Sequence, residues 1–93
     1  MRFAFIILGD FDTTVDKASI HQETAQIIGV SSVEQACIVA EKLHTDGVDC
    51  IELCGAFGED GANKIIAATK NEIPIGYVVH FEKQNELFEK LFG

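Results

Sequence analysis

A carboxylate, a thiol and three glycines lie close together in the segment "IELCGAFGEDG", residues 51–61. Glu52 lies inside a strand-like run, and Cys54 lies at its end. The glycines that follow mark a sharp turn from a strand into a helix. The segment is therefore a candidate for a phosphate-binding loop, a cysteine active site or a structural turn.

The glycine spacing argues against a phosphate-binding loop. The glycines read G-x-x-G-x-x-G, whereas the dinucleotide-binding pattern is G-x-G-x-x-G after the first strand, and the lysine of a P-loop is absent. Glu59 and Asp60 also occupy the expected first helical turn, where carboxylates already interact with the positive end of the helix dipole. The spacing favours structural turn glycines.

Cys54 is a candidate nucleophile, because a helix N-terminus after it favours the thiolate form. His80 is expected to end the fourth strand at the same edge of the sheet, so a Cys–His pair is one interpretation. The alternative is that Cys54 is a small packing residue. His80 would then line a crevice or simply end a strand.

Glu52 is unusual because it lies within an otherwise apolar strand. A buried carboxylate without a partner is costly, so this position calls for a hydrogen bond, a charge partner or exposure to water. One interpretation is a general base or ligand anchor. The alternatives are a structural pair with Arg2, Tyr77 or a lysine, or an edge of the sheet that is left uncovered.

The cysteines and histidines indicate no metal site and no cofactor. Cys50 and Cys54 would lie about 13 Å apart in a strand that rises about 3.3 Å per residue, too far to share a metal or form a disulfide. Cys37 belongs to the apolar stripe of a helix. His21 with Asp10 and Asp12 has no recognised ligand spacing.

Hydrophobic periodicity predicts one α/β domain over residues 1–93. Strands are expected at 3–8, 24–30, 49–55 and 74–80, and helices at 32–46, 58–71 and 82–93, with a short helix around 14–20. A capping box of Ser31 with Glu34, or of Ser32 with Gln35, would begin the first long helix, and Gly47 would end it. Parallel pairing through right-handed crossovers gives a four-stranded, mainly parallel sheet of order 2-1-3-4. The predicted fold is a small three-layer sandwich of the flavodoxin-like or Rossmann-like kind, with the short link and the last helix covering one face.

In such sheets ligands bind beyond the carboxyl ends of the strands, where the winding direction reverses. That point lies between the first and third predicted strands. The segment therefore predicts a small-molecule crevice there, with Cys54, Glu52 and His80 as candidate catalytic residues. The candidate ligand-binding residues are Asp10, Gly55, Ala56, Phe57 and Gly58.

Composition restricts the partners. The chain carries 7 basic and 15 acidic residues, a net charge of −8, with no Lys/Arg cluster, so nucleic acid and anionic membranes are not expected partners. Three cysteines and no export signal indicate free thiols in the cytoplasm. The apolar strand "PIGYVVH" at a sheet edge, with the dense apolar face of the last helix, predicts a homodimer or a larger ring.

The segments "FAFIILGD", "IELCGAFGEDGANKI", "PIGYVVH" and "LFEKLFG" resemble a family of small prokaryotic proteins classed as a domain of unknown function. The resemblance covers most of the chain and implies no activity. The leading hypothesis is a small binding protein. The alternatives are a cofactor-independent isomerase or lyase that uses Cys54 or Glu52 with His80, and an oligomeric interaction module without a ligand.

Overall fold

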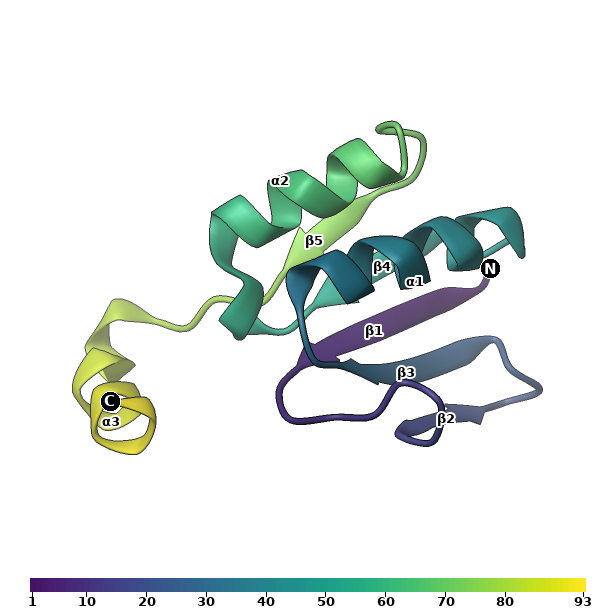
Figure 1. Ribbon diagram of the computed structural model, residues 1–93. Coiled ribbons are helices and arrows are strands. Elements are labelled where there is room, and N and C mark those ends of the chain that lie inside the picture. Colours follow the sequence, from purple (N-terminus) through teal and green to yellow (C-terminus); the bar gives the residue numbers. More distant parts are fainter.

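The sheet is built around β1 (Phe3–Leu8), the uniformly apolar strand near the N-terminus. A computed structural model describes residues 1–93 and places β1 third in a five-stranded sheet of order β2-β3-β1-β4-β5 (Figure 1). β1 pairs in parallel with β3 (Ala25–Val30) and with β4 (Cys50–Leu53), and β4 pairs in parallel with β5 (Ile75–Tyr77). The α/β class is confirmed, and the four predicted strands are neighbours in the predicted order.

The sheet nevertheless differs from the prediction in strand number and in direction. β2 (Lys17–Ile20) forms where a short helix was expected, and it runs antiparallel to β3. The turn between them places three consecutive non-glycine residues in the left-handed region, with φ values of 48°, 57° and 64° at residues 21–23. Non-glycine residues seldom adopt this region, and hairpin turns that do so normally carry Asn or Gly. The hairpin therefore has no recognisable turn sequence, and β3 is an interior strand instead of the expected edge strand.

The loop between β1 and β2 crosses the carboxyl end of β3. Gly29 donates its N–H to the Asp16 carbonyl oxygen (2.8 Å), and its own carbonyl oxygen accepts from Thr13 Oγ1 (3.0 Å). The Phe11 ring lies directly over Gly29, where a Cβ would come within 2.6 Å of the ring atom Cγ. Glycine is required at this position because the aromatic ring approaches the backbone so closely.

α1 (Val33–Thr45) begins and ends as the sequence predicted, to within one residue. Ser32 Oγ accepts a hydrogen bond from the Gln35 N–H (3.1 Å), which selects Ser32 as the N-cap. The Gln35 amide oxygen accepts from the Ser31 N–H (2.8 Å). In a standard capping box it would accept from the N–H of the N-cap residue, Ser32, so here the reciprocal contact goes to the residue before the N-cap. Gly47 then ends the helix with φ of 96°.

α2 (Gly58–Ala68) follows a short 3-10 helix, η1 (Gly55–Phe57), that joins it to β4. α1 and α2 lie side by side on one face of the sheet (Figure 1). Alternate strand residues point into this layer and are buried against it: Ala4, Ile6, Ile28, Val30, Ile51 and Leu53.

No helix covers the opposite face of the sheet, where only the Phe11 ring lies over Gly29 at the carboxyl end of β3, so the predicted three-layer sandwich is wrong and the body has two layers. The link after β1 extends the sheet through β2 instead of covering it, and the last helix lies elsewhere (Figure 1). We call this surface the open face. Its residues come from alternate positions of all five strands: Phe3, Phe5, Ile7, Ala18, Ile20, Ala25, Ile27, Gly29, Cys50, Glu52 and Gly76.

The C-terminal segment leaves the body after β5. It contains a 3-10 turn, η2 (Glu82–Gln84), and α3 (Asn85–Phe92), and we call residues 78–93 the C-terminal arm. No residue of α3 is buried. The radius of gyration is 13.4 Å, above the value of about 12 Å expected for a compact chain of this length. The arm therefore projects from the body instead of packing on it.

Candidate functional site

Glu52 lies on the open face, midway along β4. It is in register with Phe5 of β1 on one side and with Gly76 of β5 on the other. A Cβ at position 76 would come within 2.7 Å of Glu52 Oε2, so the missing side chain of Gly76 is the space into which the carboxylate extends. Phe5, which is 38% exposed, lies beside it on β1, and Ile27, which is 42% exposed, lies one strand further away on β3.

No cation of the chain pairs with Glu52. The only ion pair in the structure joins His44 Nδ1 and Glu72 Oε1 (3.9 Å). Arg2, one of the expected partners, instead donates from Nη1 to the Asp46 carbonyl oxygen (2.6 Å). Tyr77, another expected partner, is in register with Leu53, so it belongs to the other face of the sheet. The expected uncovered edge is not found either, because β4 lies between β1 and β5; Glu52 is instead on a face of the sheet that no helix covers.

Cys54 lies just after β4, and its thiol is engaged by the backbone of the neighbouring strand. The Leu8 N–H donates to Cys54 Sγ (3.3 Å), and the Cys54 N–H donates to the Ile6 carbonyl oxygen (3.1 Å). The side chain is half-buried against the hydrophobic core. The helix that begins immediately after it is only the single turn η1, and α2 starts four residues further on.

His80 lies in the C-terminal arm, because β5 ends at Tyr77 and not at residue 80 as the sequence predicted. Its Nε2 is 2.7 Å from the Asn85 side-chain oxygen, and its ring stacks on Phe88 with centroids 3.9 Å apart. Every side-chain contact of His80 is thus made within the arm. The proposed Cys54–His80 pair stays a prediction from sequence.

Backbone conformation and close packing explain why glycine occupies positions 58 and 55 of the turn. Gly58 adopts φ 62° and ψ −174°, a region open essentially to glycine alone. A Cβ at Gly55 would lie 3.2 Å from the Val78 carbonyl oxygen. Of the other residues expected to line the crevice, Asp10 and Ala56 are exposed, and Phe57 is 5% exposed and forms part of the hydrophobic core.

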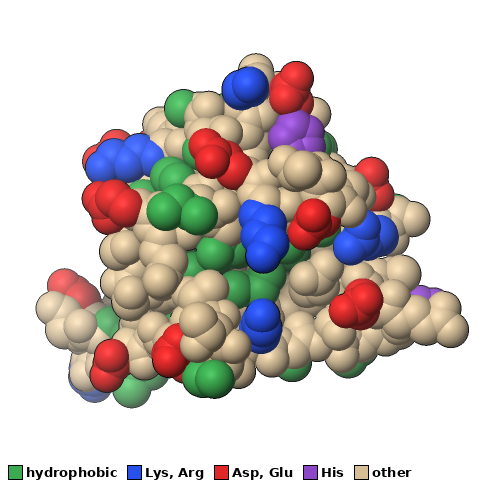
Figure 2. Space-filling view, turned by 45° about the vertical axis from the view of Figure 1, so that its right-hand side comes forward, with side chains coloured by type: hydrophobic (Ala, Val, Ile, Leu, Met, Phe, Trp, Pro, Cys, Tyr) green, Lys and Arg blue, Asp and Glu red, His purple; other side chains and the backbone are tan.

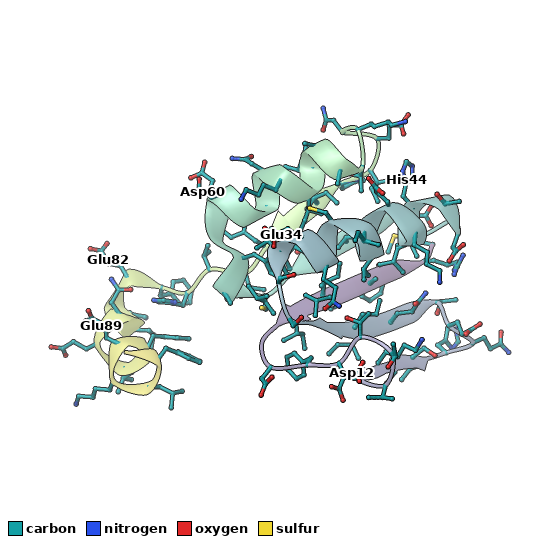
Figure 3. All side chains as sticks on the ribbon, viewed as in Figure 1. Asp12, Glu34, His44, Asp60, Glu82 and Glu89 are labelled. Carbon is teal, nitrogen blue, oxygen red and sulfur yellow. The ribbon has the colours of Figure 1, made fainter.

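The acidic residues of the loop after β1 structure the loop itself. Asp12 Oδ1 accepts from the Thr14 hydroxyl (2.6 Å) and from the Thr14 N–H (2.9 Å), and these two bonds lower the pKa of Asp12. Asp16 Oδ2 accepts from the Asp12 N–H (2.7 Å). Figure 3 shows Asp12 in this loop, far from the arm that carries Glu82 and Glu89. No group of three or more His, Cys, Asp or Glu side chains is arranged to hold a metal ion.

Two shallow hollows lie in the C-terminal arm. One is lined by Phe81, Glu82 and Lys83, and the other by Glu86, Glu89, Lys90 and Gly93. Each is formed by neighbouring residues of one segment, which do not enclose a ligand. On the side of the molecule seen in Figure 2, acidic and basic side chains alternate around apolar ones and form no patch of a single sign.

Residues 1–93 match a family of unknown function, DUF6506. The chain belongs to this family. The resemblance found in the sequence is therefore confirmed over the whole chain. No curated protein and no solved structure matches it. None of its helices is long and apolar enough to cross a bilayer.

Sequence reasoning found Glu52 but not its surroundings. The sequence predicts an apolar edge strand at Gly76 and a strand buried on both faces at Phe5, and neither expectation shows that Glu52 has space beside it. The signal that was present is the register: a glycine beside a carboxylate on the adjacent strand leaves room for that carboxylate.

Proposed function

We propose that this protein binds a small molecule on the open face, toward the carboxyl ends of β1 and β4. The observation that carries the proposal is the carboxylate of Glu52, which lies beside Phe5 in the space left by the missing side chain of Gly76 and pairs with no cation. Its oxygens accept from no donor of the chain and are open to water, so they are free to accept from a ligand. The bound molecule would provide the donor.

The surroundings define the class of ligand. Phe5, in register with Glu52 on the neighbouring strand, offers an apolar surface, which favours an aromatic or aliphatic body. Glu52 offers an acceptor for an amine or another strong donor, and a charge-assisted bond of this kind is about twice as strong as a neutral one. We therefore expect a ligand with an apolar body and a cationic or hydrogen-bond-donating group.

Titration followed by two-dimensional NMR tests this function. Phenethylamine carries an aromatic body and an ammonium group, and 3-phenylpropionate carries a similar body with the opposite charge. We expect the amine to shift the amide signals of Phe5, Glu52 and Gly76. It should bind at least about tenfold more tightly than the acid, a difference of about 1.4 kcal/mol in binding free energy, because only the amine can donate a charge-assisted hydrogen bond to Glu52. The variant Glu52→Gln should remove this preference.

Glu41→Gln is the matched control, because Glu41 is an exposed carboxylate on α1, away from the open face. It should bind the amine as the natural chain does. Equal binding of amine and acid, or amine-induced shifts that persist unchanged in Glu52→Gln, would contradict the proposed function.

A further inference from the structure

The C-terminal arm carries an apolar surface that the chain itself does not cover. Seven of the 15 exposed large hydrophobic side chains lie in this arm. On α3, Leu87 is 60%, Leu91 76% and Phe92 76% exposed, whereas the polar residues of the helix lie between them. A contiguous apolar surface of this kind on a small protein marks an interaction site.

The open face is a second uncovered apolar surface on the same chain. It is five strands wide and bordered by Phe11 at the carboxyl end of β3. Phe5, Ile20 and Ile27 are exposed there, and Phe3 packs edge-on against Phe5. An amphipathic helix is the element that normally covers such a face in an α/β protein. The chain contains both halves of this contact, and they do not meet.

The shape of the arm keeps α3 away from its own sheet. At its start, the Val78 N–H donates to the Leu53 carbonyl oxygen (2.9 Å) and holds residue 78 against the end of β4. Beyond it, His80 forms a hydrogen bond with Asn85 and stacks on Phe88. These two contacts fix the segment before α3 against α3 itself. Between these two anchors only Val79 is free, and the arm points past the carboxyl edge of the sheet (Figure 1). A helix held there is positioned to reach another molecule.

We propose that α3 docks on the open face of a second copy of this chain, in a reciprocal two-fold dimer. In such an isologous contact each copy gives its arm and receives its partner's, so both apolar surfaces of both copies are covered at once. A fully buried phenylalanine accounts for about 150–250 Å². Each arm brings Phe92, the two leucines and the 39% of Phe88 that its stacking on His80 leaves exposed, and the receiving face adds an equal area. The two contacts together reach on the order of 1,200–2,000 Å², the range of specific stable interfaces.

The second copy would also complete the ligand site, and this part of the inference rests on the proposed function. A helix is about 10–12 Å wide, whereas five strands about 4.8 Å apart span roughly 19 Å between the outer strand axes. A partner helix seated over Ile20 and Ile27, on β2 and β3, therefore leaves Phe5 and the β4–β5 side of the face uncovered. Phe5 and Glu52 would then stand beside a wall formed by the partner's helix instead of on an open surface.

Sedimentation velocity on single variants tests the dimer. At micromolar concentration the natural chain should sediment as a dimer, with a mass of twice 10.2 kDa. The variant Leu91→Asp/Phe92→Asp and the variant Ile27→Lys change the two proposed surfaces separately, and each should weaken the dimer by about 100-fold or more. Ile38→Asp is the matched control, because Ile38 is an exposed apolar residue (68%) on α1, outside both surfaces, and it should leave the dimer intact.

Mixing the two variants tests whether the arm of one copy docks on the open face of the other, as opposed to any other contact between copies. The arm variant keeps an intact open face, and the Ile27→Lys variant keeps an intact arm. A one-to-one mixture should therefore form a heterodimer with one good contact, although neither variant dimerises alone. Ile20→Lys, on edge strand β2, replaces Ile27→Lys if the latter does not fold, as judged from its amide NMR spectrum.

Three results would overturn the proposal: a natural chain of 10.2 kDa at every concentration, a dimer that survives both variants, or a mixture that stays monomeric. Failure of the ligand site is a separate result. A dimer whose Glu52 amide signal does not respond to phenethylamine would support the exchange and contradict the proposed function, and a monomer that binds the amine would do the reverse.

Discussion

Cys37 is the residue whose surroundings most clearly alter its chemistry. It lies half-buried on α1, where partial burial first, and then the negative charges of Glu34 and Glu41, raise the pKa of its thiol above the ordinary value. Both causes disfavour the thiolate, since desolvation and a like charge penalise the ionised form. Its Sγ lies 3.7 Å from the Lys64 carbonyl oxygen, in the layer between α1 and α2.

Iodoacetamide labelling, resolved by residue with mass spectrometry, should therefore show Cys37 reacting later in a pH titration than a cysteine in an unstructured peptide. The nucleophile is the thiolate, so a raised pKa moves the midpoint of the rate to higher pH. By linkage, the matching contribution to stability is fully present below the ordinary thiol pKa and is lost as the pH rises through the raised one.

The double variant Glu34→Gln/Glu41→Gln provides the comparison for this labelling. Removing both charges should move the midpoint of Cys37 part of the way back, while the effect of burial remains. A midpoint at or below that of the free peptide would show that Cys37 is not in this environment. The same spectra report Cys54, whose expected reactivity is a prediction from sequence.

At the scale of elements, α1 and α2 end in the same motif with different residues. After α1, the Val48 N–H donates to the Leu43 carbonyl oxygen and the Gly47 N–H to that of His44. After α2, the Asn71 N–H donates to Ile66 and the Lys70 N–H to Ala67, in the same two-bond pattern. Gly47 has φ of 96° and Lys70 φ of 57°, so a lysine occupies the left-handed position that a glycine normally takes.

Lys70→Gly should therefore stabilise the protein by about 1 kcal/mol, because the left-handed conformation costs a residue with a Cβ roughly 1–2 kcal/mol. Urea unfolding measures the difference. Lys64→Gly is the matched control: it lies inside α2, where glycine should cost about 1 kcal/mol. A loss of stability in Lys70→Gly would mean that residue 70 does not adopt the left-handed conformation.

At the scale of the whole molecule, the body and the arm are separable. The hydrophobic core lies entirely within residues 4–65, between the sheet and the two long helices, and no residue of η2 or α3 is buried. The body therefore owes little of its packing to the arm. The arm instead carries many exposed apolar side chains. Their exposure to water is unfavourable in a single molecule and would be relieved by contact with another one.

A chain shortened to residues 1–79 should accordingly fold, keep the circular dichroism of the body and remain monomeric. Its melting temperature should not depend on protein concentration. The melting temperature of the full chain should rise with concentration, because association of folded copies shifts the equilibrium by mass action. An unfolded short chain would show that the arm supports the body directly. A short chain that still dimerises would place the interface on the body.

The residues that the sequence identified correctly are those whose reasons are local. β1 follows from six consecutive apolar residues, and α1 from its apolar spacing, the Ser32 cap and the Gly47 stop. Each of these depends on residues within a few positions of one another, so no knowledge of the rest of the chain is needed. The family was recognisable for a related reason, since its distinctive segments are continuous stretches of sequence.

What the tertiary structure decided are the features that depend on distant partners. β2 forms because it pairs with β3. All four of its residues are exposed, and the left-handed turn that follows contains no glycine or asparagine, so the sequence shows no hairpin pattern. Glu52 could be read as a buried charge or as an exposed one until the second helical layer proved absent. His80 could be placed only once β5 was known to end three residues earlier. Whether an apolar side chain is covered depends on which element lies opposite, and strand periodicity is the same on both faces of a sheet.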